Sequence, residues 1–198
     1  IVTGRPIADI DHFLQPLRLP VAGIHGAQGR HADGRGWQLP PPALGAVEAV
    51  VRGLLALDSG LQLERKAVAL ALHYRRAPHL AERCLQHLQA AVAASPGLEL
   101  LQGKCVLEVK PAGVSKGRAI ERFLAEPPFL GRQPAFAGDD VTDEAGFDAV
   151  LRHGGLALKV GDGPTCAPHR LASPAALHQT LAAWSQRLAQ TTQREESA

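Results

Sequence analysis

The chain of 198 residues has no methionine, one tyrosine, three cysteines and no long apolar run. Its longest apolar stretch, residues 67–72, is far too short to span a membrane, so we expect no membrane partner. The scattered cysteines make a poor disulfide framework and lack metal-binding spacing, so we expect reduced thiols in a cytoplasmic protein. A net charge of +2 without a basic run argues against nucleic-acid binding.

The absence of methionine also means that the chain has no initiator residue. It begins with Ile1-Val2-Thr3, which is typical of the end of a strand. We therefore expect that a further N-terminal segment precedes residue 1 in the complete protein. The hydrophobic content of 45% is sufficient for a packed core, and the length suits one large domain or two small ones.

The apolar pattern predicts an α/β protein with a split core. Residues 41–110 follow the order helix, strand, strand, helix, strand, strand, which is typical of a module with an antiparallel sheet. On either side strands alternate with helices, which indicates a parallel sheet. We expect a core formed by residues 1–36 and 111–188, an inserted domain at 37–110 and a disordered polar tail at 189–198.

The individual elements are predicted from periodicity and from the positions of glycine and proline. Helices are predicted at residues 7–14, 41–58, 78–94, 115–124, 143–152 and 177–188. Strands are predicted at residues 1–2, 19–24, 61–64, 67–74, 98–101, 105–109, 134–137 and 156–160. A loop is predicted at residues 27–36, and a hairpin turn at 102–103.

The most informative stretch is residues 138–144, Gly-Asp-Asp-Val-Thr-Asp-Glu, which follows a short apolar strand. Two carboxylates about 5 Å apart repel by roughly 3 kcal/mol at an effective dielectric near 20, and a cation relieves that repulsion. Oxygen ligands without Cys or His favour Mg²⁺. The stretch also fits an acidic helix N-terminus, with Thr142 as the cap and Asp143 and Glu144 favoured by the helix dipole. The two interpretations are compatible.

Other polar residues also follow predicted strands or begin helices. Thr3, Gly4 and Arg5 offer a hydroxyl, an open backbone and a guanidinium, which suit a phosphate oxygen. Lys116 begins a helix, where a phosphoryl group binds well. Taken singly, the favoured interpretations are a structural turn for residues 3–5 and a solvated surface lysine for Lys116. Because ligands bind beyond the carboxyl ends of parallel strands, we expect one rim to gather Thr3-Gly4, His25-Gly26, Asp139-Asp140 and Gly161.

Charged residues alternate on two predicted strands. Glu64 and Lys66 are two residues apart and so share a face, as do Glu108 and Lys110. Such a face can bind sugar hydroxyls, or it can be an ordinary solvated face. His73 either extends this surface or ends a strand without a further role.

Together these motifs resemble the trehalose-6-phosphate phosphatases of the haloacid dehalogenase superfamily, over the chain to about Trp184. The resemblance rests on residues 138–144, 2–5, 23–26, 71–75, 107–111 and 115–117. It implies a Rossmann-like parallel-sheet core with an inserted α/β cap. It also implies Mg²⁺-dependent hydrolysis of trehalose 6-phosphate to trehalose and phosphate in trehalose biosynthesis, through an aspartyl-phosphate intermediate.

The resemblance assigns roles residue by residue. Thr3 and Lys116 would hold the phosphoryl oxygens and form the catalytic set together with Asp139. The expected Mg²⁺ ligands, direct or through water, are Asp139, Asp140 and Asp143. The expected substrate contacts are Thr3, Gly4, Arg5, His25, Gly26, Arg30, Glu64, Lys66, Glu108 and Lys110.

The chain departs from the family pattern in specific ways. The leading strand with its Asp-x-Asp-Gly-Thr motif is absent, so the nucleophile would lie outside residues 1–198 and these residues alone would be inactive. The nucleophile strand would separate the strands that end at Thr3 and Gly138, so those two should not pair. Arg65 and Ser115 stand where related sequences often carry an acid. Two alternatives remain: a non-catalytic phosphosugar-binding or regulatory domain, and a phosphatase for a related sugar phosphate such as sucrose phosphate.

Overall fold

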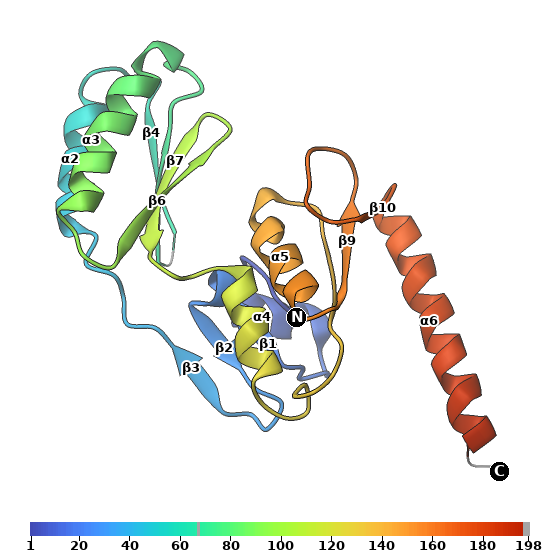
Figure 1. The fold of residues 1–198 in the computed structure, drawn as a ribbon. Helices are drawn as coiled ribbons and strands as arrows, with labels where there is room; N and C mark the ends of the chain where they lie inside the picture. Colours follow the sequence, from blue (N-terminus) through green and yellow to red (C-terminus); the bar gives the residue numbers. More distant parts are fainter. Residues whose placement is uncertain (67, 196–198) are drawn as a thin grey trace. The chain divides into compact units, whose positions relative to one another are not determined.

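The computed structural model describes residues 1–66 and 68–195, and the chain forms two compact units, Ile1–Val114 and Ser115–Ala198 (Figure 1). The predicted domain boundaries at residues 36 and 110 remain predictions. Within the described ranges, we find no helix with the length and apolar character needed to cross a membrane.

The first unit begins with a helix and a small antiparallel sheet. Its elements are α1 (Ile7–Leu14), β1 (Val21–Gly23), the short 3-10 helix η1 (Ile24–Gly26), β2 (Gln28–Arg30) and β3 (Gly36–Gln38), with sheet order β1-β2-β3. Helix α1 has the predicted bounds. The predicted first strand is present only as a parallel bridge between Val2 and Ala22, supported by the Thr3 amide donating to the Ala22 carbonyl at 2.9 Å.

The predicted loop at residues 27–36 is wrong, because β2 and β3 form a hairpin there. Gly29 lies opposite Trp37 in the register, and the indole packs directly over it. A Cβ built on Gly29 would lie 2.0 Å from the Trp37 ring, so the glycine permits this contact. The sequence pattern missed the hairpin because glycine and polar residues lack the apolar alternation that marks a strand.

The rest of the first unit is a four-stranded antiparallel sheet covered on one face by two helices (Figure 1). The predicted order of elements is confirmed. The elements are α2 (Gly45–Leu55), β4 (Gln62–Arg65), β5 (Leu70–His73), the 3-10 helix η2 (Pro78–Leu80), α3 (Ala81–Ala93), β6 (Leu98–Gly103) and β7 (Val106–Pro111), with strand order β4-β5-β7-β6.

Side-chain alternation gives this sheet two different faces. Leu72 pairs with Leu63 and Leu107 and points into the core beneath the helices, where Val51 and Leu88 are fully buried. On the opposite face, the next register position aligns Glu64, Ala71 and Glu108 across three strands. Glu108 and Lys110 share a face of β7 as predicted, and Glu64 lies on the same face, whereas Lys66 follows the end of β4.

The start of α2 and the position of the β6–β7 turn are among the boundaries that differ from prediction. Helix α2 begins at Gly45 rather than at residue 41, because the prolines at 40–42 hold the preceding backbone outside the helical region. The hairpin turn is formed by Lys104 and Cys105 rather than by residues 102–103, because Gly103 still pairs with Val106. Cys105 adopts the left-handed conformation, with φ 61°, that the tight turn needs.

The second unit contains a parallel sheet of order β10-β9-β8, as predicted for this region. Its elements are α4 (Lys116–Leu124), β8 (Ala135–Gly138), the 3-10 helix η3 (Val141–Asp143), α5 (Glu144–Arg152), β9 (Leu156–Val160), β10 (His169–Leu171) and α6 (Pro174–Glu195). Strand β10 was not predicted, because a short, mostly exposed segment has no apolar run. Helix α6 extends beyond the predicted residues 177–188 at both ends, and residues 196–198 of the expected tail lie outside the described residues.

Candidate active site

A cavity of about 330 Å³ in the first unit gathers most of the predicted substrate-binding residues. The polar face of the four-stranded sheet and the turn after Thr3 both contribute to its lining. The lining residues are Gly4, Arg5, Pro6, Ile24, His25, Glu64, Lys66, Val68, Ala69, Glu108, Lys110 and Val114. The volume lies within the range of small-molecule sites.

The sheet side of the cavity is a network of paired charges. Lys66 forms an ion pair with Glu108, and His73 Nε2 lies 2.9 Å from Glu64 Oε2. Lys110 is largely buried and donates to the Val114 carbonyl at 2.5 Å, with its Nζ also 3.0 Å from Glu99 Oε1. These contacts hold long side chains in defined positions, which lowers the entropy lost when a ligand binds.

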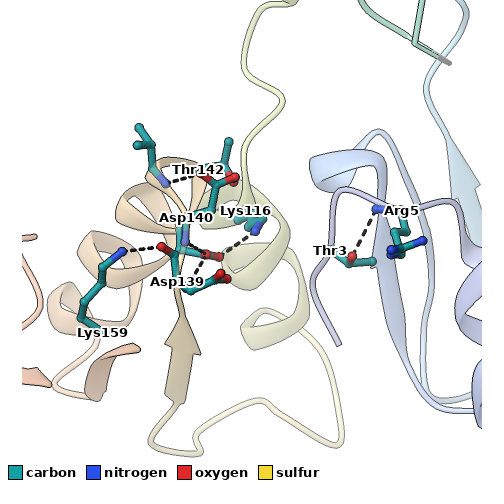
Figure 2. A network of polar contacts seen from close by, with 9 residues as sticks. Thr3, Arg5, Lys116, Asp139, Asp140, Thr142 and Lys159 are labelled. Atoms are coloured by element: carbon teal, nitrogen blue, oxygen red, sulfur yellow. Dashed lines mark hydrogen bonds and ion pairs between the residues drawn. The ribbon is translucent and has the colours of Figure 1, made fainter. Parts of the chain in front are cut away.

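The turn side of the cavity is built by local hydrogen bonds around Gly4. The Thr3 hydroxyl accepts the Arg5 amide at 3.1 Å, as Figure 2 shows. The His25 amide donates to the Thr3 carbonyl at 2.9 Å, and the Ile24 amide donates to the Arg5 carbonyl at 3.1 Å. The predicted Thr3-Gly4-Arg5 turn is therefore pinned to the end of β1.

His25 is held in an uncommon backbone conformation. Ile24 and His25 have φ values of 50° and 56°, in the left-handed region that costs non-glycine residues free energy. The imidazole covers Gly4 so closely that any Cβ there would lie 2.8 Å from Cε1 and Nε2. Strain of this kind persists where the surrounding structure fixes a functional geometry.

Three predicted substrate contacts do not line the cavity. Arg30 makes a two-pronged ion pair with Asp11, at 2.6 and 2.7 Å, and donates to the Leu19 carbonyl at 2.9 Å. This pair holds the pKa of Asp11 below its ordinary value. The Gly26 carbonyl accepts the Trp37 indole N–H at 3.1 Å. Thr3, the third, uses its hydroxyl within the turn.

The acidic stretch in the second unit is organised around Asp143, which is buried. Its Oδ1 accepts from the buried Lys116 ammonium at 2.7 Å. Its Oδ2 accepts the backbone amides of Asp139 and Asp140 at 3.0 and 2.9 Å. Asp140, rather than Thr142, caps the following turn, because its Oδ1 accepts the Val141 amide at 2.6 Å. The interpretation as a helix start is thus confirmed with a different cap.

Asp139 and Asp140 carry the exposed carboxylates of this stretch. Among the described residues, the Asp139 carboxylate makes no hydrogen bond or ion pair. Within residues 1–66 and 68–195, no group of three His, Cys, Asp or Glu residues is arranged to hold a metal ion. Of the three expected ligands, Asp139 and Asp140 are exposed, with Asp140 also capping the following turn, and Asp143 is buried against Lys116.

Sequence reasoning gave no role to Lys159, and it placed Glu144 only at an acidic helix N-terminus. Lys159 is buried on β9 opposite Gly138 and donates to the Asp139 carbonyl at 2.5 Å. Glu144 accepts the Cys166 amide at 2.8 Å. Desolvation raises the pKa of Glu144, but hydrogen bonds from Cys166 and Thr165 outweigh it and leave that pKa below its ordinary value. The sequence signal that could have identified Lys159 is its position inside the otherwise apolar predicted strand of residues 156–160.

Comparison with known proteins places this geometry in a family. The chain is 42% identical over 174 residues to the trehalose-6-phosphate phosphatase of Escherichia coli, which covers 87% of this chain. The chain spans 65% of the length of that relative. The C-terminal domain of the Candida albicans trehalose-6-phosphate phosphatase superposes with a TM-score of 0.72 at 25% identity, covering 91% of this chain and 75% of that one.

A more distant phosphatase of the haloalkanoate (HAD) enzyme superfamily, from Bacteroides thetaiotaomicron, shares the fold alone. Its TM-score is 0.61 at 15% identity, with 93% of this chain and 81% of that one covered. The family model described as trehalose-phosphatase matches residues 1–175. The chain therefore belongs to the trehalose-phosphatase family and has its α/β, HAD-like fold.

Proposed function

We propose that the complete protein hydrolyses trehalose 6-phosphate to trehalose and phosphate, in trehalose biosynthesis. The observation that carries this proposal is the cavity of about 330 Å³ and its lining of both charge signs. The free thiols of all three cysteines suit a reducing compartment, so we place the reaction in the cytoplasm.

The cavity has the donors and acceptors that a phosphorylated disaccharide needs. Glu64 and Glu108 accept hydrogen bonds from sugar hydroxyls, and Lys66 and Lys110 donate to hydroxyl oxygens. Arg5 lines the same cavity and attracts the phosphate. Donors and acceptors of this lining that lose their partner hydroxyls are left unsatisfied, so such a lining discriminates between sugars.

The chain's own groups also suit the phosphoryl end of the substrate. Thr3 offers a hydroxyl at the pinned turn, and Lys116 offers a buried ammonium at the start of α4. The family resemblance implies a phosphoryl contact for each of them, and the Lys116–Asp143 pair keeps the ammonium in place. The attacking aspartate that the resemblance implies stays a prediction for the complete protein.

The exposed carboxylates fit a magnesium ion. Mg²⁺ commonly binds through one or two carboxylates, water and substrate phosphate, so Asp139 and Asp140 form a sufficient protein contribution. Asp143 contributes by holding the amides of both residues. Bound Mg²⁺ would neutralise charge on the phosphoryl oxygens.

The test measures phosphate release by the full-length protein. Trehalose 6-phosphate, sucrose 6-phosphate, glucose 6-phosphate and p-nitrophenyl phosphate are compared, each with Mg²⁺ and with excess EDTA. We expect the highest kcat/KM for trehalose 6-phosphate, and loss of turnover in EDTA that added Mg²⁺ restores.

Other outcomes point elsewhere. A higher kcat/KM for sucrose 6-phosphate would transfer the proposal to a related sugar phosphate. Calorimetric binding of trehalose 6-phosphate without any turnover would favour a phosphosugar-binding or regulatory domain. Equal rates on all esters would contradict a role for the cavity in recognition.

A further inference from the structure

Lys159 is a buried cation at the end of the strand next to the acidic stretch. Its side chain lies on β9, whose neighbours Leu158 and Val160 are buried and apolar. An ammonium group has three donors and is costly to bury. An apolar residue would stabilise this strand at lower cost, so the lysine calls for a specific role.

The contact that Lys159 makes is with backbone. Its Nζ donates to the Asp139 carbonyl at 2.5 Å (Figure 2). The amide of the same peptide unit belongs to Asp140, and it donates to Asp143 Oδ2 at 2.9 Å. Asp143 is in turn held by Lys116 at 2.7 Å. Both polar atoms of the Asp139–Asp140 peptide are therefore fixed by buried charged side chains.

Fixing a peptide at both polar atoms prevents its rotation. The orientation of that peptide sets the directions in which the Cα–Cβ bonds of Asp139 and Asp140 point. Loss of the carbonyl contact would leave the amide contact as a single pivot. Groups that orient metal-binding side chains in this way affect affinity without touching the ion.

We propose that Lys159 is a positioning residue that clamps the Asp139 carbonyl and so aims the Asp139 and Asp140 carboxylates at one Mg²⁺ ion. The inference rests on the proposed function, because it deepens the account of the same site. In this inference Lys159 holds the carbonyl of the Asp139–Asp140 peptide, and Asp143, paired with Lys116, holds its amide.

The test replaces Lys159 in the full-length protein. Lys159→Met keeps the length of the side chain and removes its donors, and Lys159→Gln keeps a polar group that is too short to reach the carbonyl. Lys104→Met, on an exposed turn, is the matched control. Mg²⁺ affinity is measured by calorimetry and by the rise in melting temperature that Mg²⁺ produces.

We expect Lys159→Met to weaken Mg²⁺ binding by about 10- to 100-fold, the usual effect of losing a group that orients a ligand. At saturating Mg²⁺, kcat should fall while KM for trehalose 6-phosphate stays near the wild-type value. Hydrogen exchange at the Asp140 amide should become faster. Lys104→Met should match the wild type in all three measurements.

A folded Lys159→Met variant with wild-type Mg²⁺ affinity would overturn the inference. If that variant does not fold, Lys159→Gln decides in the same way. Failure of the proposed function is separable: a wild-type protein that binds Mg²⁺ but does not hydrolyse trehalose 6-phosphate would still show the loss of affinity. If the wild type hydrolyses trehalose 6-phosphate but Lys159→Met and Lys159→Gln both bind Mg²⁺ as the wild type does, the role of Lys159 is contradicted and the proposed function stands.

Discussion

Gly4 lies directly beneath the imidazole of His25, with no room for a methyl group between them. We expect Gly4→Ala to displace the ring and the Thr3-Gly4-Arg5 turn and to lower kcat/KM for trehalose 6-phosphate by about 10- to 100-fold, since small misplacements are costly in catalysis. Gly45→Ala is the control, because nothing lies within 4 Å of its new Cβ. That change should stabilise the protein slightly, by about 0.4–1 kcal/mol.

A double variant separates the clash from other effects at this position. His25→Ala removes the ring that the added methyl group would meet, so Gly4→Ala should cost much less in that background. Kinetics of all four proteins give the coupling between the two positions. Purely additive losses of kcat/KM would mean that the close approach of His25 to Gly4 does not affect catalysis.

The carboxylates of the acidic stretch should respond differently to neutralisation. Asp143→Asn leaves the buried Lys116 without its counter-charge, which should destabilise the protein by about 3–5 kcal/mol. Asp139→Asn alters an exposed carboxylate, so the free energy of unfolding should stay within about 0.5 kcal/mol of the wild type while Mg²⁺-dependent turnover is lost. Urea denaturation and phosphate release, measured in parallel, distinguish the two. Near-normal turnover of Asp139→Asn would remove the metal assignment.

Glu108 offers a test of sugar recognition. Its partner Lys66 and the cavity hold it in position, and it lies on the polar face of the sheet, not in the core. Glu108→Ala should lower kcat/KM for trehalose 6-phosphate at least about tenfold more than for p-nitrophenyl phosphate. Glu82→Ala, on helix α3, should affect neither substrate. Equal losses on both substrates would indicate that Glu108 supports the fold.

Acid sensitivity should depend on Glu48. Hydrogen bonds from Arg65 and Arg52 lower the pKa of this carboxyl to about 2, from an ordinary value of 4.5. Because the folded-state pKa is depressed, the stabilisation is present above pH 4.5 and is lost as the pH falls toward 2. The melting temperature of the wild type should therefore fall more steeply between about pH 5 and pH 3 than that of Glu48→Gln. Parallel curves would show that the pair with Arg65 is not maintained in solution.

Sequence reasoning succeeded where a periodic pattern is long or a motif is dense. Helix α1 and strand β9 have their predicted bounds, and Glu108 and Lys110 share a face of β7 as predicted. The hairpin of β2 and β3 was not predicted, because its main contact is between Gly29 and Trp37. That contact depends on tertiary packing that no local apolar pattern reports.

The site shows the same limit. The acidic stretch indicated a cluster of carboxylates, but not that Asp143 would bind Lys116 and two backbone amides while Asp139 stays exposed. Residue type cannot reveal which carboxylates the protein itself neutralises. Arg30 is similar, because its partner Asp11 lies on a different element and only the fold brings the two together.

The alternation of β5 separates two tasks within a single strand. Leu70 and Leu72 point into the core, whereas the small, buried Ala71 between them lies on the other face, between Glu64 and Glu108. Glu64 and Glu108 can be replaced without altering the volume of the core beneath Leu70 and Leu72, since neighbouring residues on a strand never share a face. Under the proposed function, directed evolution toward a different sugar phosphate would begin with Glu64 and Glu108 rather than with the leucines of β5.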